Sequence, residues 1–475
     1  MGQSNPQHPR AWRKALAWLG LGFGLLAGAA ATAAPTARSL APTPPMGWNS
    51  WDAYGFTLNE AQFKANASVL AGFKAYGWRY AVIDEGWYMQ NPLGEHLADR
   101  RYSLDGHGLL TPDPARFPSA AGGAGFKPLA DWAHAQGLKF GLHIVRGIPK
   151  QAVADNAPIE GSAFHAADAA DTADTCPWDD GDYGVKDNPA GQAYYDSMMR
   201  LYAGWGVDFV KVDCIADHPY KASEIRQIAA AIQKTGRPML LSLSPGPAQL
   251  ANADVLARYS QMWRIADDLW DGWSFTHDKP GEDFPNGVRS GFDNLAAWNA
   301  HAGPGHWPDA DMLPFGMLAP HPGWGDPRRS RLTPDETRTE FTLWAIARSP
   351  LILGANLTLL DDTTRTLMSD RALIDLNQHA AESHPVAAPA DLPDARFWLA
   401  RIPGRGRYLA VFNLAPEQRS LNLTWSQLGL GSGRWCVSQL GSASPGRSAA
   451  TQTVTLAAHA SAVFRVTAPG RCGGV

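Results

Sequence analysis

Short apolar segments alternate with segments long enough for a helix along most of this 475-residue chain, and this alternation restricts the fold more than any other feature. Strands separated by helices form a parallel sheet, since a parallel neighbour can only be reached through a long crossover. Roughly eight such repeats predict a (β/α)8 TIM barrel. The expected strands are Gly47–Trp51, Tyr80–Asp84, Lys139–Val145, Asp208–Asp213, Met239–Ser244, Met262–Ala266, His306–Met312 and Leu351–Gly354.

The intervening segments are predicted to be helical, for example over Glu60–Tyr76, Pro128–Gln136, Ala190–Gly204 and Lys221–Thr235. A doubly wound open sheet is the alternative for such a pattern. No glycine-rich dinucleotide fingerprint follows the first strand, so the barrel is preferred.

The pattern changes from about Ala387, where short β-rich runs are divided by clusters of Gly, Pro and Ser. This pattern predicts a C-terminal antiparallel β-sandwich. We therefore divide the chain into an N-terminal segment over residues 1–34, a catalytic barrel over 35–382 and the β-sandwich over 383–475. The sandwich is expected to cover barrel surface or to bind glycan.

The N-terminal segment has the features of a signal peptide. Arg10, Arg13 and Lys14 precede an apolar stretch, Ala15–Ala30, that is too short to span a bilayer, and small residues follow at Ala31–Ala34. An uncleaved anchor or an interfacial helix is the alternative. We expect cleavage and a secreted or periplasmic protein that has no membrane contact after it.

Charge and cysteine content narrow the classes further. The formal net charge is −4 and the charges are scattered, so no basic stripe exists to follow nucleic acid. The four cysteines match no metal spacing. Disulfides between Cys176 and Cys214 and between Cys436 and Cys472 suit an exported chain, but spacing leaves the connectivity open, and four unpaired buried thiols are the alternative.

Acidic residues follow several of the expected strands. In a barrel the carboxyl ends of the strands carry the active site, so acids repeated at these ends indicate chemistry, whereas a single one is often a helix cap or a loop ion pair. No nucleophile elbow or metalloprotease motif is present. The acids are Asp84, Glu85, Asp213, Asp267, Asp268, Asp309 and Asp311.

Two carboxyl groups with cationic and aromatic neighbours form the arrangement that cleaves glycosidic bonds. A retaining enzyme needs one ionised carboxylate to attack the anomeric carbon and a second, protonated carboxyl to assist the leaving oxygen. Lys211 lies two residues before Asp213 and shares its strand face, so it would keep Asp213 ionised. Arg264 would lie near Asp268. An inward salt bridge with a neighbouring acid is the alternative role for Lys211.

Ordered motifs from residue 42 to residue 380 resemble glycoside hydrolase family 27, the family of α-galactosidases and α-N-acetylgalactosaminidases. The C-terminal β-rich region is also similar to the family. The motifs are PMGWNSW (45–51), IDEGW (83–87), KFGLH (139–143), WGVDFVKVD (205–213), WR with an Asp four residues after the Arg (263–268), GPGHWPDADML (303–313) and TLWAIARSPLILG (342–354).

The resemblance implies a barrel with a C-terminal β-sandwich, retention of configuration, and no metal or organic cofactor. Asp213 takes the position of the family's nucleophile and Asp268 that of its acid/base. The positions that bind the sugar are implied to be Trp51, Asp84, Glu85, His143, Lys211, Ser244, Arg264 and Asp311.

This chain departs from the family pattern at three positions. Glu85 replaces the second of two aspartates, takes up room near the C6 hydroxymethyl, and resembles the β-L-arabinopyranosidases of the family. His143 stands where a Tyr is usual. Ser244 lies in a segment that replaces the family's Cys-Glu-Trp and resembles the α-N-acetylgalactosaminidase branch. A long insertion, Arg146 to Asp187, is expected to form a loop over the site.

The sequence therefore predicts an exo-acting α-galactosidase that removes terminal α-D-galactosyl residues from oligo- or polysaccharides. The alternatives within the family are β-L-arabinopyranosidase and α-N-acetylgalactosaminidase activity. A carbohydrate-binding protein without catalysis is the alternative from another class, although it would need neither carboxylate. The oligomeric state is left open.

Overall fold

The computed structural model describes residues 40–93, 99–277, 284–320, 325–442, 446–468 and 472. The predicted signal peptide over residues 1–34 lies outside them. No helix formed by the described residues is both long and apolar enough to cross a membrane.

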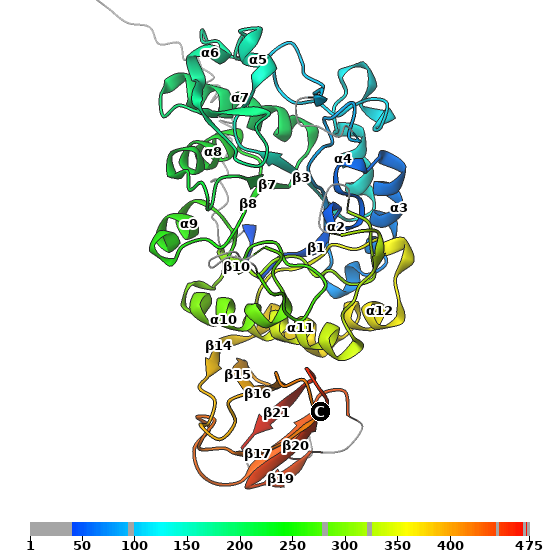
Figure 1. Ribbon diagram of the computed structural model, residues 1–475, viewed down its shortest axis with the longest axis vertical. Coiled ribbons are helices and arrows are strands. Elements are labelled where there is room, and N and C mark those ends of the chain that lie inside the picture. The colour runs from blue at the N-terminus through cyan, green and yellow to red at the C-terminus, as the bar shows by residue number, and fades with distance from the viewer. Residues whose placement is uncertain are drawn as a thin grey trace, which may run out of the picture. The chain divides into compact units, whose positions relative to one another are not determined.

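Eight parallel strands of the described chain form the predicted TIM barrel, with each strand beside its neighbour in the order β10-β9-β8-β7-β3-β2-β1-β13 (Figure 1). The ends of this sheet meet where the Leu313 amide donates to the Ile352 carbonyl over 2.7 Å. The strands are β1 (Met46–Asn49), β2 (Tyr80–Ile83), β3 (Lys139–Val145), β7 (Phe209–Asp213), β8 (Leu240–Leu243), β9 (Met262–Arg264), β10 (Trp307–Asp309) and β13 (Leu351–Leu353).

Helices surround the barrel, and their ends are set by local sequence (Figure 1). Asn59 and Gln62 form a reciprocal capping box at the start of α3, and Thr333 and Glu336 form another at the start of α11. The helices are α2 (Trp51–Tyr54), α3 (Glu60–Ala71), α4 (Lys127–Ala135), α7 (Pro189–Trp205), α8 (Ala222–Thr235), α9 (Ala253–Tyr259), α10 (Val288–Trp298), α11 (Pro334–Ala347), α12 (Asp362–Met368) and α13 (Arg371–His379).

Shorter elements complete this part of the chain. The helix predicted over Glu60–Tyr76 is interrupted after Ala71, where Gly72 follows the last residue of α3. The short elements are the strand pair β11 (Met317–Leu318) and β12 (Arg328–Arg329), and the 3-10 helices η1 (Gly55–Thr57), η2 (Lys74–Tyr76), η4 (Pro118–Gly123), η5 (Leu250–Asn252), η6 (Asn299–His301) and η7 (Leu357–Leu359).

The inner face of the barrel changes from apolar to charged along the strands. Tyr80 of β2 and Phe209 of β7 belong to one buried apolar cluster inside the barrel. Because side chains alternate across a strand, Lys211 and Asp213 face the same interior as Phe209. Asp84, four residues after Tyr80, continues the inner face of β2 in the same way. The apolar layer therefore supports a charged layer at the carboxyl ends of the strands.

The insertion after β3 is not the single long loop expected from the sequence. It folds into a small three-stranded sheet with two short helices. Ala and Asp dominate this segment, so its apolar residues show no clear alternation, and its strands were not predicted. Its elements are β4 (Ile148–Pro149), α5 (Lys150–Ala154), α6 (Ala166–Ala169), β5 (Ala170–Thr175) and β6 (Asp182–Val185).

The predicted β-sandwich is formed by a six-stranded antiparallel sheet and a two-stranded one. Its first strand, β14, begins before the β-rich region expected from Ala387 and contains Pro385. A proline is tolerated there because β14 is an edge strand, where one row of amides needs no partner. The strands are β14 (Ala381–Val386), β15 (Ala395–Ile402), β16 (Gly406–Asn413), β17 (Arg419–Thr424), β18 (Trp435–Gln439), β19 (Arg447–Ala449), β20 (Thr451–Leu456) and β21 (Ser461–Thr467).

The cysteines pair as Cys176–Cys214 and Cys436–Cys472, with Cα–Cα distances of 6.0 and 5.2 Å. These are the pairs that the sequence suggested for an exported chain. The first joins the insertion to the residue that follows β7.

We expect Gly47→Ala to destabilise the barrel. A Cβ at residue 47 would lie 2.3 Å from the Tyr80 carbonyl oxygen of the neighbouring strand, so the backbone must shift. The free energy of unfolding should fall by about 1–3 kcal/mol, measured by chemical denaturation. Gly204→Ala is the control, because no atom lies within 4 Å of its added Cβ on α7. That change should raise stability by up to about 1 kcal/mol, and equal effects of the two substitutions would contradict the packing account.

Candidate active site

A cavity of about 270 Å³ opens at the carboxyl ends of the barrel strands, where the charged layer lies. It contains most of the residues that the sequence predicted for the site. Its lining is formed by Trp51, Phe56, Asp84, Glu85, Arg100, Trp178, Asp179, Lys211, Asp213, Arg264, Asp268, Trp270, Phe284 and Met312.

Asp213 is the last residue of β7, and its two carboxylate oxygens have different partners. One accepts from the Cys214 amide over 2.6 Å, and the other lies 3.3 Å from Nε2 of His143 on the adjacent strand β3. Burial raises the pKa of Asp213, but the hydrogen bond and charge of His143, the charge of Lys211 and the Cys214 amide together hold it below its ordinary value. Asp213 is therefore kept ionised.

Asp84 follows β2 and lies deeper, with 3% of its side chain exposed. Lys211 Nζ donates to its Oδ2 over 3.0 Å, and Nδ2 of the Asn49 side chain donates to the same oxygen over 2.6 Å. Burial raises the pKa of Asp84, yet the charges of His143 and Lys211 outweigh burial and lower it well below its usual range. The inward salt bridge considered for Lys211 is thus present, and Lys211 also lines the cavity.

Asp268 lies four residues after β9 and is the more accessible of the two predicted catalytic acids. Its side chain is 41% exposed, against 18% for Asp213. Arg264, the last residue of β9, approaches Asp268 at 3.3 Å and Asp311 at 2.8 Å. The preceding Asp267 accepts from the Asp268 amide, and it is not among the residues that line the cavity.

Glu85 is buried against a second carboxyl group. Its side chain is hydrogen-bonded to Asp179 of the insertion, and both residues line the cavity. Burial is the main cause that raises the pKa of Glu85, and the charges of Asp179 and Asp213 raise it further. These influences favour the protonated form of Glu85, whereas the surroundings of Asp84 favour its charged form.

Three predicted residues lie behind the cavity wall rather than in it. His143 is 1% exposed and contacts Asp213, with Asp84 at 3.9 Å. Asp311 orients Arg264 and accepts from the Leu269 amide. Ser244 is buried at the end of β8, and its hydroxyl has no hydrogen-bond partner among the described residues. A sugar-binding role for Ser244 remains a prediction.

The sequence reasoning missed the residues that reach the cavity from outside the barrel strands. Trp178 and Asp179 come from the insertion, and Arg100 comes from the segment between β2 and α4. The acids and aromatics after Cys176, in the run WDDGDY, were the available signal. Two aromatic side chains at the cavity, Trp178 and Phe284, are 37% and 46% exposed, as a surface for a second sugar ring would be.

No group of three or more His, Cys, Asp or Glu side chains in the described ranges is arranged to hold a metal ion. The arrangement is instead one of carboxyl groups, and apart from Glu85 the acids described above as lining or supporting the cavity lie near a cation. Lys211 forms an ion pair with Asp84 and also interacts with the charge of Asp213. Arg264 forms ion pairs with Asp268 and Asp311. Arg100 forms an ion pair with Asp179.

Comparison with known proteins identifies relatives along nearly the whole chain. A family model described as alpha galactosidase A matches residues 177–379. Alpha-galactosidase A of Cellvibrio japonicus is 31% identical over 417 residues, covering 86% of this chain and 85% of that protein. An alpha-N-acetylgalactosaminidase of Gallus gallus is 28% identical and covers 72% of this chain and 71% of its own length.

Among solved structures, a family 27 β-L-arabinopyranosidase from Geobacillus stearothermophilus is similar to this chain. Its TM-score is 0.84 at 38% identity, and the match covers 92% of this chain and 99% of that one. A variant of that enzyme has been solved in complex with arabinose and superposes equally well, with a TM-score of 0.84.

We expect His143→Ala to move the acidic limb of the pH dependence of kcat/KM to higher pH. Loss of the His143 contact removes an interaction that lowers the pKa of Asp213, so ionised Asp213 would be lost at a less acidic pH. His134→Ala is the matched control, because His134 pairs with Asp208 near the amino end of β7 and should leave the limb in place. An unmoved limb in His143→Ala would show that Asp213 is not the group that titrates.

Proposed function

The chain belongs to glycoside hydrolase family 27, and on this basis we propose that it is a retaining exo-glycosidase for terminal sugars of galactose configuration, with β-L-arabinopyranosides preferred over α-D-galactosides. The two disulfides are compatible with an exported protein, and we propose a secreted or periplasmic location with a carbohydrate substrate.

Asp213 is the proposed nucleophile. It attacks the anomeric carbon while the glycosidic bond breaks, and Asp268 donates its proton to the leaving oxygen. Water then attacks the same carbon, Asp268 takes the proton from that water, and Asp213 leaves as a carboxylate. The sugar is released with its original anomeric configuration, since the carbon has been inverted twice.

The environments of the two acids support these roles. His143, Lys211 and the Cys214 amide keep Asp213 ionised, as attack on carbon requires. Asp268 is more exposed, which suits a group that must reach both a departing sugar and an entering water. Arg264 lies beside Asp268 and is itself fixed by Asp311, so the position of Asp268 is restrained.

The preference for an arabinopyranoside rests on one observation, the position of Glu85 in the cavity wall. Glu85 is one methylene longer than the aspartate usual in the family, and it occupies the side of the pocket toward the sugar's C6 in the family resemblance. β-L-Arabinopyranose has the galactose configuration without C6. An α-D-galactoside remains the second candidate, supported by the Cellvibrio japonicus relative.

The first test compares hydrolysis of p-nitrophenyl β-L-arabinopyranoside, α-D-galactopyranoside and α-N-acetylgalactosaminide. We expect the highest kcat/KM for the arabinopyranoside. Glu85→Asp should shift the ratio toward the galactoside by about 10-fold or more, as expected for one methylene in a tight pocket. A higher kcat/KM for the galactoside in the unmodified enzyme would favour the second candidate. Absence of turnover on all three would contradict the proposed substrate class.

Substitutions of the two acids should differ in their dependence on the leaving group. Asp213→Ala should lower kcat by about 10⁴-fold or more on every substrate, because the covalent intermediate cannot form. Asp268→Asn should lose about 10²–10⁴-fold on alkyl or sugar leaving groups and less on nitrophenyl, which leaves without protonation. Circular dichroism checks that both variants fold. Equal losses of the Asp268 variant on all leaving groups would point to another acid.

A further inference from the structure

Glu85 and Asp179 place two carboxyl groups in direct contact within the cavity wall. They come from different parts of the chain, Glu85 from the end of β2 and Asp179 from the insertion. Both side chains are buried, at 8% exposure for Glu85 and 5% for Asp179. A hydrogen bond between two carboxyl groups needs a proton on one of them, and the proximity of Asp179 raises the pKa of Glu85, after burial, its largest cause.

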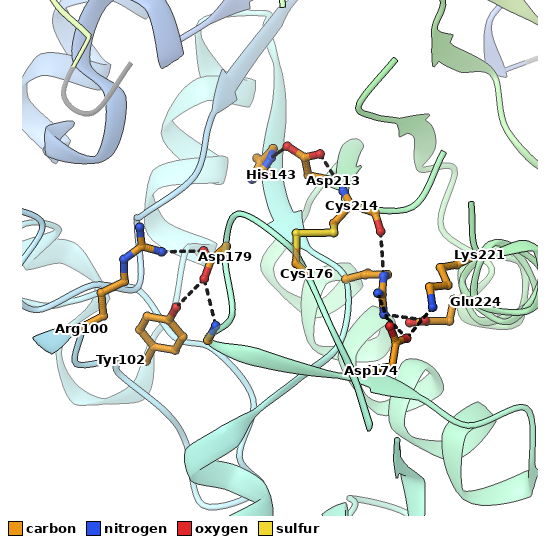
Figure 2. Close-up of a disulfide and its surroundings, with 12 residues drawn as sticks. Arg100, Tyr102, His143, Asp174, Cys176, Asp179, Asp213, Cys214, Lys221 and Glu224 are labelled. Atoms are coloured by element: carbon orange, nitrogen blue, oxygen red, sulfur yellow. Dashed lines mark hydrogen bonds and ion pairs between the residues drawn. A yellow bond between two sulfur atoms is a disulfide. The ribbon is translucent and has the colours of Figure 1, made fainter. Parts of the chain in front are cut away.

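The partners of Asp179 show which carboxyl carries the charge. Arg100 donates to its Oδ2 over 2.7 Å, and the Gly181 amide donates to its Oδ1 over 3.0 Å (Figure 2). Tyr102 lies 3.5 Å from the same Oδ1. These groups all donate to Asp179, whereas burial and the charge of Asp179 raise the pKa of Glu85 and favour the proton on Glu85.

Asp179 is held in place by contacts that do not involve Glu85. Cys176, three residues earlier, is bonded to Cys214, the residue after Asp213 (Figure 2). Two residues before Cys176, Asp174 forms a double contact with Arg146 at 2.9 and 3.0 Å. Arg146 in turn donates to the Cys214 carbonyl over 2.7 Å. The segment that carries Asp179 is thus fixed to the end of β7.

A glutamate is long enough to adopt several rotamers, so its carboxyl needs a partner to stay in one place. The Asp179 carboxylate supplies that partner from a rigid segment. We propose that Asp179 is a positioning residue that holds the Glu85 side chain against the pocket and thereby sets the room left for the C5 substituent of the sugar. This inference rests on the proposed function, and extends it from Glu85 to the insertion.

The Asp179→Ala variant tests the proposal. Without its partner, Glu85 can turn away and admit a hydroxymethyl group, so the ratio of kcat/KM for the α-D-galactoside over the β-L-arabinopyranoside should rise by about 10-fold. Asp179→Asn keeps an oxygen that can accept the Glu85 proton and should change the ratio less. Asp180→Ala is the matched control, because Asp180 is 58% exposed and pairs with Lys150 outside the cavity.

A double-mutant cycle separates positioning of Glu85 from a general loss of structure. In a Glu85→Asp background the shorter side chain has already vacated the space, so adding Asp179→Ala should leave the substrate ratio nearly unchanged. The same additional change in ratio in both backgrounds would overturn the proposal, because Asp179 would then act independently of Glu85. An unchanged ratio in the single Asp179→Ala variant would overturn it as well.

Failure of the proposal for Asp179 can be distinguished from failure of the proposed function. If the unmodified enzyme hydrolyses neither glycoside, the substrate class is wrong. If it hydrolyses them with a measurable ratio that Asp179→Ala and Asp180→Ala leave equally unaffected, the substrate class stands and the role of Asp179 is wrong. Thermal denaturation of each variant confirms that the ratios are compared between folded proteins.

Discussion

Lys211 lies 3.0 Å from Asp84 inside the barrel, and its buried charge acts on both Asp84 and Asp213, the two acids at the centre of the charged layer. Removing one partner of a buried ion pair leaves an uncompensated charge and typically costs about 3–5 kcal/mol. His143 and Lys211 together offset the charges of Asp84 and Asp213 and hold the pKa of each carboxyl below its ordinary value, against burial, which raises it. Arg264 likewise forms ion pairs with Asp268 and Asp311. Positive charge on the barrel strands is therefore what permits several acids to share one cavity.

Glu85 is the exception to this balance, because it is buried without an ion pair of its own. Arg100 forms its ion pair with Asp179 rather than with Glu85. The pKa of Glu85 is therefore raised, mainly by burial, while that of Asp84 next to it is lowered. Neighbouring carboxyl groups thus offer the sugar different hydrogen-bonding properties, although the sequence presents them as a simple acidic pair.

The barrel and the insertion contribute to the site in different ways. The barrel strands position the charged layer on top of an apolar one, so the directions of Lys211, Asp213 and Arg264 follow from strand geometry. The insertion brings its residues from the side, and a disulfide and an arginine contact fix it to the end of β7. Substrate choice within a shared fold commonly depends on such loop segments, because the strands are constrained by packing.

The sequence by itself determined the barrel, the β-sandwich and the residues at the ends of the barrel strands. These features follow from local period and chain order, since a strand residue's face is fixed by its position in an alternating pattern. Only the tertiary structure decided that Asp179 and Arg100 reach the cavity, that His143 and Asp311 lie behind its wall, and that burial beside Asp179 raises the pKa of Glu85. These facts depend on contacts between segments far apart in the chain, and on burial, neither of which a local pattern contains.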